Sequence, residues 1–322
     1  MAAAYLSILL FLAVEAPGIY RAEPLRAFAV GNAPILVAAV GMTLVILSRQ
    51  IDISIGSQFS LCAVAAGLLA RLGLPMPMVG AGTLAIGAGM GAINGALVAG
   101  LGLPSIVVTL ATLVIGRESL RYAREGAFVG DLPADFQWFG AGQATGQWVV
   151  VGLAVATFAG FAWGLRHLAA GRAIHATGSD PEAARLAGIQ PRRVTFAVFV
   201  AMGALTGLAA LLGASQFPAV DPKAGTGLEM QVIAAVVVGG TAVSGGRGGL
   251  LGTLIGVLLL GTINPALVYL GAGAAESLRA DGGRGAWLAR LLLGLGPEWE
   301  RAIQGAIILL AVASDGFSRK AR

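Results

Sequence analysis

Long apolar runs, broken by short polar stretches, are the dominant pattern along the chain. The runs lie near residues 2–19, 31–49, 53–72, 77–100, 105–122, 147–168, 194–216, 228–244, 248–270 and 302–314. A helix needs roughly 17 to 25 apolar residues to cross a hydrocarbon core of about 30 Å, and most of the runs have that length. The pattern therefore predicts an all-α fold: a polytopic transmembrane helical bundle of about ten spans, with two inverted repeats as one way to build it.

Composition agrees with a membrane protein that forms one domain over residues 1–322. Hydrophobic residues make up 57% of the chain and charged residues 11%, against about 25% charged residues in soluble proteins. The basic residues behind the net charge of +5 cluster in a few breaks, which indicates membrane topology and a lipid bilayer partner, with no nucleic acid. The single cysteine, Cys62, excludes a disulfide within the chain, and we expect no metal site.

The break at 166–193 sets the predicted orientation. Its arginines outnumber its acidic residues, and the positive-inside rule places such a break in the cytoplasm. Alternation of the spans then puts both termini in the cytoplasm and the segment 123–146 on the outer side. Three arginines would face outward against the rule: Arg21, Arg26 and Arg71.

Residues 178–189, GSDPEAARLAGI, contain start and stop signals for a short helix. Two starts fit the sequence: Ser179 as the cap with Glu182 as its capping-box partner, or Asp180 as the cap before Pro181. Gly188 can close the helix in a left-handed conformation. The expected apolar face, which would pack on the bundle, consists of Ala183, Leu186, Ala187 and Ile189.

This short helix needs a packing partner, because two helical turns are marginal by themselves in water. Two roles fit a charged helix on the cytoplasmic side of a bundle. It is either a coupling helix that transmits a partner's motion to the spans, or a solvated loop helix that lies on the membrane surface.

Two glycine-rich or serine-rich breaks predict tight turns on the inner side. In IDISIGS, at 51–57, we expect Asp52 to cap the following helix, which begins near Ser54 and Gly56. The break at 239–249, GGTAVSGGRGG, predicts a compact turn, because glycine tolerates positive backbone angles. Its structural glycines include Gly239, Gly240, Gly245 and Gly246.

Glycines and small polar residues within the spans each have a packing role and a functional alternative. GAGMGAING in the fourth span and GGLLGTLIG in the ninth predict close contact of helix backbones, or the lining of a pathway. Small polar residues in spans usually bond neighbouring helices, but they also supply hydrogen bonds to a polar solute. The candidates for a substrate path are Thr43, Ser60, Asn94, Thr109, Thr112, Gln231 and Asn264.

Four segments carry a family resemblance. They are GMTLVILSRQIDISIGSQ at 41–58, LPSIVVTLATLVIGRESL at 103–120, GRAIHATGSDPEAARLAGIQPRRVTFAVF at 171–199 and GTGLEMQVIAAVVVGGTAVSGGRGGLLGTLIG at 225–256. In this order they resemble the permease subunits of sugar-type ABC importers, and most closely the rhamnose and autoinducer-2 permeases. The chain departs from that pattern at Asp180, which replaces Asn, at Ala111, which replaces Gly, and at 271–302, where an extended outer loop replaces a short one.

The resemblance implies a multi-pass subunit of the bacterial inner membrane that holds no cofactor, because a partner subunit binds the ATP. Its implied partners are ABC ATPase subunits, a periplasmic solute-binding protein and a second permease chain, identical or related. The ATPase would dock on the cytoplasmic loop 172–193. The implied coupling residues are Ser179, Asp180, Glu182, Ala183, Ala184, Arg185, Gly188, Ile189 and Arg192.

Two transport functions compete at this stage. The chain has no G-x-x-x-x-G-K-[ST] phosphate loop, as expected for a permease whose partner hydrolyses ATP. The alternative is an ion-coupled secondary transporter or channel for a small polar solute, which needs ionisable groups in the membrane. The candidates for such groups are Glu15, Asp52, Glu118 and Glu229. We do not expect an enzyme, because the only histidines, His167 and His175, have no ligand cluster around them.

Overall fold

The computed structural model describes residues 2–280 and, beyond them, positions 302, 305 and 306. Most of the predicted span at 302–314 and of the predicted outer loop 271–302 lies outside the described residues. Within them, each of the other nine predicted spans contains a helix. The part of the chain that the structure describes contains no β-strand, which confirms the all-α class.

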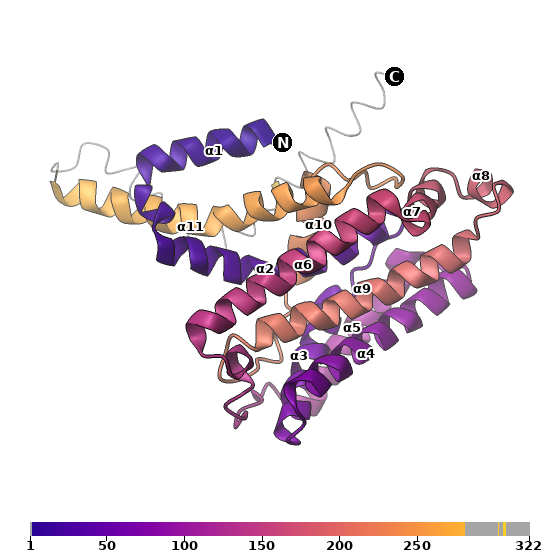
Figure 1. Cartoon of the computed structure of the whole chain (residues 1–322), viewed down its shortest axis with the longest axis horizontal. Coiled ribbons are helices and arrows are strands. Elements are labelled where there is room, and N and C mark those ends of the chain that lie inside the picture. Colours follow the sequence, from indigo (N-terminus) through magenta and orange to yellow (C-terminus); the bar gives the residue numbers. More distant parts are fainter. Residues whose placement is uncertain (1, 281–301, 303–304, 307–322) are drawn as a thin grey trace.

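The helices follow one another with short connections. They are α1 (Ala2–Glu15), α2 (Ala22–Leu47), α3 (Ile55–Arg71), α4 (Met76–Gly95), α5 (Ser105–Arg124), α6 (Gln143–His167), α7 (Ala169–Ser179), α8 (Pro181–Leu186), α9 (Pro191–Ala214), α10 (Leu228–Val238) and α11 (Leu250–Ala280). A π-helical segment, η2 (Ala96–Gly100), extends α4, and 3₁₀ turns lie at Pro17–Tyr20 and Gln137–Gly140. Figure 1 shows α8 at one end of the bundle and α1 beside α11.

Five helices are long and apolar enough to cross a membrane. They are Ala22–Leu47, Met76–Gly100, Gln143–His167, Pro191–Ala214 and Leu250–Leu270. The polytopic membrane class is therefore confirmed. The predicted span at 228–244 is wrong in length, because α10 ends at Val238 and its 11 residues cover only about 16 Å of a hydrocarbon core of about 30 Å.

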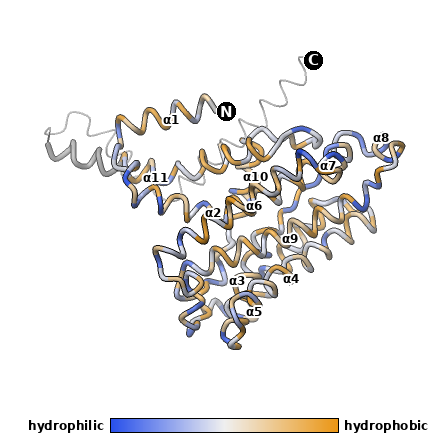
Figure 2. The backbone as a smooth tube through the Cα atoms, in the orientation of Figure 1, coloured by the Kyte–Doolittle hydropathy of each residue, from blue (hydrophilic) through white to orange (hydrophobic). Residues whose placement is uncertain are grey.

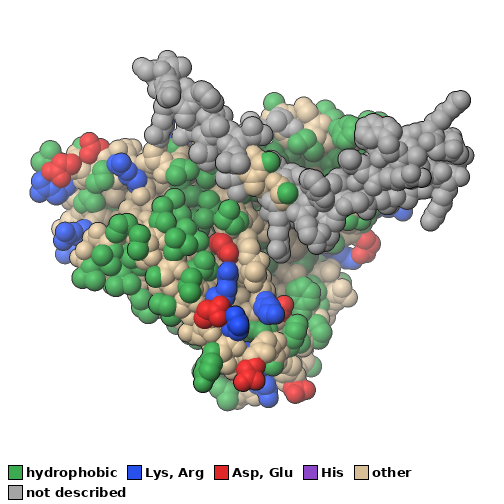
Figure 3. Space-filling view, turned by 180° about the vertical axis from the view of Figure 1, so that it is seen from behind, with side chains coloured by type: hydrophobic (Ala, Val, Ile, Leu, Met, Phe, Trp, Pro, Cys, Tyr) green, Lys and Arg blue, Asp and Glu red, His purple; other side chains and the backbone are tan. Residues whose placement is uncertain are grey.

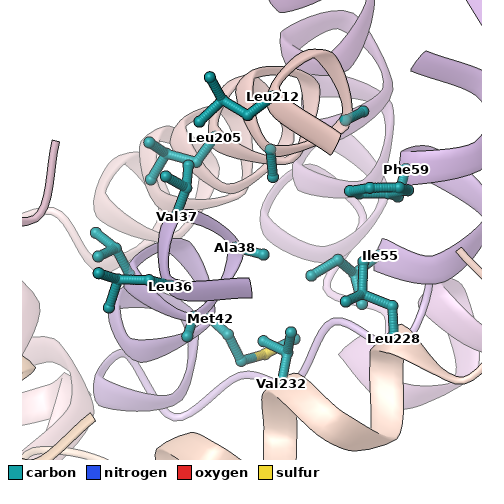
Figure 4. Packing of buried hydrophobic residues seen from close by; sticks show 14 of the residues in the cluster. Leu36, Val37, Ala38, Met42, Ile55, Phe59, Leu205, Leu212, Leu228 and Val232 are labelled. Carbon is teal, nitrogen blue, oxygen red and sulfur yellow. The ribbon is translucent and has the colours of Figure 1, made fainter. Parts of the chain in front are cut away.

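The centre of the core is α2, which is packed on nearly all sides. Figure 4 shows Val37 of α2 near Leu205 of α9, and Met42 near Val232 of α10. A helix that is apolar all round is favoured at such a central position, because no face of it meets water. The neighbours of α2 are α9, α6, α11 and α10.

The crossing of α4 and α9 depends on glycine. Gly87 and Gly91 of α4 lie against Gly203 and Gly207 of α9, and a Cβ at any of these positions would meet the backbone of the other helix. Such close contact gives dispersion and weak hydrogen-bonding interactions that larger side chains would prevent. The packing interpretation of GAGMGAING is confirmed.

Polar residues gather at the two ends of the bundle (Figure 2). At the α7–α8 end, the predicted compact turn 239–249 is present, with positive φ at Gly240, Gly245 and Gly246. The amide of Gly246 donates to the carbonyl of Leu47 at 2.9 Å, and a ring nitrogen of His175 lies 3.2 Å from the Gly246 carbonyl. The turn therefore connects the end of α2 to α7.

Candidate functional site

Two helices of the bundle begin in its interior, after non-helical stretches. The chain is not helical between α2 and α3, at 48–54, and again between α9 and α10, at 215–227. Non-helical backbone at membrane depth is tolerated where protein surrounds it, and in transporters it commonly lies near the substrate. These two stretches therefore mark the candidate site.

The starts of α3 and α10 touch each other through glycine backbone. A Cβ on Gly56 would lie 2.6 Å from the carbonyl oxygen of Gly225, and a Cβ on Gly225 would meet the carbonyl of Gly56. The amide of Gly225 donates to Ser60 Oγ at 3.0 Å. Figure 4 shows Ile55 and Leu228, which belong to these two helix starts, close together. We call this contact the joint, comprising residues 51–60 and 221–229.

Asp52 lies within the joint, with an exposed fraction of 0%. Its Oδ1 accepts from the amide of Ser54 at 2.9 Å and from the Ser54 hydroxyl. The Ser54 hydroxyl in turn accepts from the amide groups of Gln58, at 2.6 Å, and Asn94, at 2.8 Å. The expected capping role needs correction in detail: α3 has no side-chain cap, and Asp52 instead holds the turn that precedes it.

Several oxygens of this network have no hydrogen-bond partner. Asp52 Oδ2, Gln58 Oε1 and Asn94 Oδ1 are buried and accept no hydrogen bond from the described residues. Buried acceptors of this kind are few in native proteins, and ionisable ones within membranes usually have a function. The joint therefore has acceptor capacity for a proton, a water molecule or a polar solute.

An ion pair joins α5 to the first turn of α10. Arg117 donates to Glu229 at 3.1 Å, with side-chain exposed fractions of 40% and 11%. Glu229 is favoured at the N-terminus of α10 by the helix dipole, and its Oε2 lies beside Gly56 of the joint. Sequence reasoning considered Glu229 only as an isolated charge and missed Arg117. The only charge in the apolar run around α10 is Glu229, so a partner of opposite charge on another helix could have been sought.

The structure brings together three of the substrate-path candidates. Ser60 belongs to the joint, Asn94 donates to Ser54 within it, and the Thr109 hydroxyl lies 3.3 Å from the carbonyl of Ile51 at its edge. Thr112 lies one turn along α5 and donates to the carbonyl of Thr109.

The remaining candidates lie elsewhere. Thr43 bonds Thr253 of α11 at 2.7 Å, which is the helix-bonding role usual for such residues. Gln231 is half-buried on α10, and Asn264 is exposed on α11.

The coupling segment forms the predicted short helix, and the structure decides how it begins. Asp180 Oδ1 accepts from the amides of Glu182, at 2.9 Å, and Ala183, at 3.1 Å, so Asp180 is the cap and Pro181 the first helical residue. Ser179 is the last residue of α7 and does not cap α8. Gly188 closes the helix at φ 83°, as predicted.

The expected apolar face of α8 is wrong. Ala184 is the buried residue, whereas Ala183 and Ala187 are exposed and Leu186 has an exposed fraction of 80%. The helix is rotated about its axis relative to the prediction, so that Ala184 alone among its residues faces the bundle. Ile189 is partly buried, and its amide bonds the carbonyl of Ala184.

The charged side chains of α8 pair with each other. Arg185 Nε donates to Glu182 at 3.2 Å, and both side chains are exposed. The Glu182 carboxylate raises the pKa of the Arg185 guanidinium, so the arginine remains charged. Arg192 is exposed at the start of α9. The helix therefore presents an apolar side chain and a charged pair to the outside of the bundle.

Charges also continue along α5. The side chains of Arg121 and Glu118 form an ion pair at 3.2 Å, with exposed fractions of 74% and 57%. Figure 3 shows acidic and basic side chains in a line down the rear face of the molecule, between areas of apolar side chains. The described residues contain no group of three or more His, Cys, Asp or Glu side chains that could hold a metal ion.

Comparison with known proteins gives a consistent result. Residues 25–312 match the family described as branched-chain amino acid transport system / permease component. The ribose import permease protein RbsC of Escherichia coli (strain K12) is 34% identical over 245 residues, which cover 74% of this chain and 75% of the relative.

The autoinducer 2 import system permease protein LsrC of Escherichia coli (strain K12 / DH10B) is 36% identical over 236 residues, 73% of this chain and 69% of the relative. No solved structure matches the chain. These relatives support a permease component rather than an ion-coupled transporter or an enzyme. The chain therefore belongs to the family of ABC importer permease components that the four segments resembled.

Proposed function

We propose that this chain is the transmembrane permease subunit of an ATP-binding-cassette importer that moves a sugar or sugar-like molecule of the rhamnose, autoinducer-2 or pentose class into the cytoplasm. The names of its relatives, a ribose and an autoinducer 2 import permease, support that substrate class. The observation that carries the proposal is α8, a capped and exposed helix at one end of the bundle. Its surface suits a protein partner, because it combines exposed Leu186 with a charged pair.

Contacts from α8 lead to the joint. The helix follows α7, where Gly178 leaves no room for a Cβ beside the carbonyl of Leu47 at the end of α2. The stretch 48–54, with Asp52, follows directly. A displacement of α8 by an ATPase would therefore reach the joint through rigid elements. These contacts favour the role of a coupling helix over that of a loop helix on the membrane surface.

The exposed charges of α5 point to a second permease chain. Arg117, Glu118 and Arg121 would be costly in lipid, so this face is expected to meet protein or water. A second copy or a related permease that faces α5 would enclose a polar path, with Thr109 and Thr112 beside it. A periplasmic solute-binding protein would deliver the substrate at the end that carries 125–142.

In this arrangement the chain is a multi-pass protein of the bacterial inner membrane with both termini in the cytoplasm. ATP is bound by the ATPase subunits, so the permease itself holds no cofactor. The arginine-rich segment 166–193, which includes α7 and α8, lies on the cytoplasmic side under the positive-inside rule.

Capture of the ATPase tests the coupling role. We expect Glu182→Arg and Arg185→Glu each to weaken copurification by roughly ten-fold, about 1.4 kcal/mol, at normal detergent-stable yield. Gly188→Val should lower the yield as well, because a β-branched residue resists the left-handed conformation at this position. Arg71→Glu, at the opposite end of the bundle, is the control.

Normal copurification and uptake for both charge reversals would reject the role of α8. The substrate class has a separate test: ATP hydrolysis by the reconstituted complex with its binding protein should be stimulated by ribose or rhamnose. Stimulation by leucine alone would instead indicate that the substrate is an amino acid.

A further inference from the structure

An apolar groove separates α6 from α9 on the face opposite the charged line. Its volume is about 990 Å³, with Leu44 of α2 and Leu84 of α4 at its floor and Ala170 and Ile174 of α7 at one end. Helices α6, α7 and α9 are in view in Figure 1, whereas the charged line is on the rear face in Figure 3. The groove is therefore distinct from the joint and from the proposed path.

The groove has the depth of one membrane leaflet. On α6 its lining extends from Ala156 to Leu165, which corresponds to about 14 Å along a helix, close to half of a hydrocarbon core of about 30 Å. Trp163 stacks on His167 at 5.6 Å near the α7 end of the groove, and the Trp163 side chain is exposed. Tryptophan is enriched at the membrane–water boundary, so the groove opens within the leaflet on the α7–α8 side.

A single cation lies at the α7–α8 end of the lining. Arg193 lines the groove in the first turn of α9, and its side chain is exposed. None of the ion pairs formed among the described residues includes it. A guanidinium group binds phosphate oxygens with two parallel hydrogen bonds, and basic pockets between membrane helices on the cytoplasmic side bind anionic lipid headgroups.

We infer that the groove is a binding site for one anionic phospholipid. An acyl chain of this lipid would lie between α6 and α9, and its phosphate would bind Arg193. The groove offers almost no hydrogen-bonding groups for a hydroxylated solute, and it lies among helices that cross the bilayer. Placement in the cytoplasmic leaflet rests on the orientation proposed above.

The bound lipid would stiffen the support of α8. Ile174 is buried in α7 and lines the groove, and α7 continues through Asp180 into α8. An acyl chain that fills the space beside Ile174 adds dispersion contacts to α7 on a side where protein is absent. The lipid is thus expected to hold α7 and the coupling helix in a fixed position relative to α9.

Native mass spectrometry of the purified full-length protein tests the site with dioleoyl phosphatidylglycerol and dioleoyl phosphatidylcholine as probes. We expect one phosphatidylglycerol to be retained in preference to phosphatidylcholine. Arg193→Gln should reduce that preference by roughly five-fold. Arg71→Gln, which removes an exposed arginine at the other end of the bundle, should leave it unchanged.

A matched glycine pair tests the groove itself. Gly160 lines it and Gly152 does not, and in both cases a new Cβ would meet open space. Gly160→Leu should therefore reduce retention of both lipids, whereas Gly152→Leu should not. Equal retention of the two lipids by the wild-type protein, or unchanged retention in Gly160→Leu, would overturn the inference. Because lipid retention is read without the ATPase, a failure of the coupling role would leave this result interpretable.

Discussion

The two stretches that interrupt the helices use the same local turn in opposite surroundings. Asp52 accepts from the amide of Ser54 at 2.9 Å, and Asp221 accepts from the amide of Lys223 at 2.8 Å, so each aspartate bonds the residue two positions on. Asp52 is fully buried, whereas Asp221 is only partly buried and its turn is exposed. The same aspartate turn therefore organises a buried hydrogen-bond network in the first stretch and forms an ordinary exposed loop turn in the second.

The difference follows from what each stretch packs against. The first is short and is enclosed by α4 and α5, which supply Asn94 and Thr109. The second is longer and partly exposed, for example at Phe217 and Lys223, and its buried Val220 pairs with the buried Val129 of the segment between α5 and α6. The joint connects them where Gly56 touches Gly225 and where Ser60 Oγ accepts from the Gly225 amide. Two inverted repeats, which would relate the two stretches, stay a prediction.

Disruption of the contact between Gly56 and Gly225 should cause the largest loss of stability and transport. Gly56→Val or Gly225→Val places a branched side chain against the backbone of the other helix start, so we expect a loss of about 3 kcal/mol in stability and no transport. Thermal unfolding in detergent and uptake in proteoliposomes measure both. Gly89→Val on α4, where a Cβ meets open space, is the control. Wild-type stability of either joint variant would show that the helix starts do not touch.

Replacement of each aspartate by alanine tests whether burial makes the difference between the two turns. Asp52→Ala leaves the buried Ser54 hydroxyl without its acceptor, so we expect about 2 kcal/mol of destabilisation or a clear loss of transport. Asp221→Ala should change stability by less than about 0.5 kcal/mol, because its turn is exposed. Equal effects on unfolding and uptake would contradict the comparison.

Loss of the hydrogen bond between Ser60 and Gly225 should cause an intermediate loss of stability. Ser60→Ala removes the acceptor for the amide of Gly225 and should destabilise the protein by about 1 kcal/mol. Ser119→Ala, at an exposed position of α5, is the matched control. If both serine variants unfold at the wild-type temperature, the two stretches are held together by the glycine contact alone.

Apart from the exposed Asp221 turn, the smallest stability effect is expected from loss of the Arg117–Glu229 ion pair. Because Arg117 is partly exposed, its pairing with Glu229 should contribute about 0.5 kcal/mol. A double-mutant cycle with Arg117→Gln and Glu229→Gln isolates that value in thermal unfolding. We expect uptake to fall more than stability, since the pair lies between the joint and the proposed path. Unchanged uptake in both single variants would restrict the pair to a structural role.

Sequence patterns located the elements and their punctuation. Apolar length identified the spans, Asp180 and Pro181 marked one of two possible starts for α8, and Gly188 marked its end. The glycines of 239–249 predicted a compact turn for the same local reason. Each of these features depends on residues a few positions apart, whose backbone preferences are legible without the rest of the fold.

Relations between distant segments were outside the reach of those patterns. Neither the pairing of Arg117 with Glu229, 112 positions apart, nor the contact of Gly56 with Gly225 follows from local preference. The face of α8 was predicted wrongly because helical periodicity shows which residues share a side, not which side meets the bundle. Sequence by itself determined the helices, the turns and the candidate caps, because these follow from local backbone and solvation energy. Only the tertiary structure decided the joint, the exposed side of α8 and the groove, because these depend on which helices pack together.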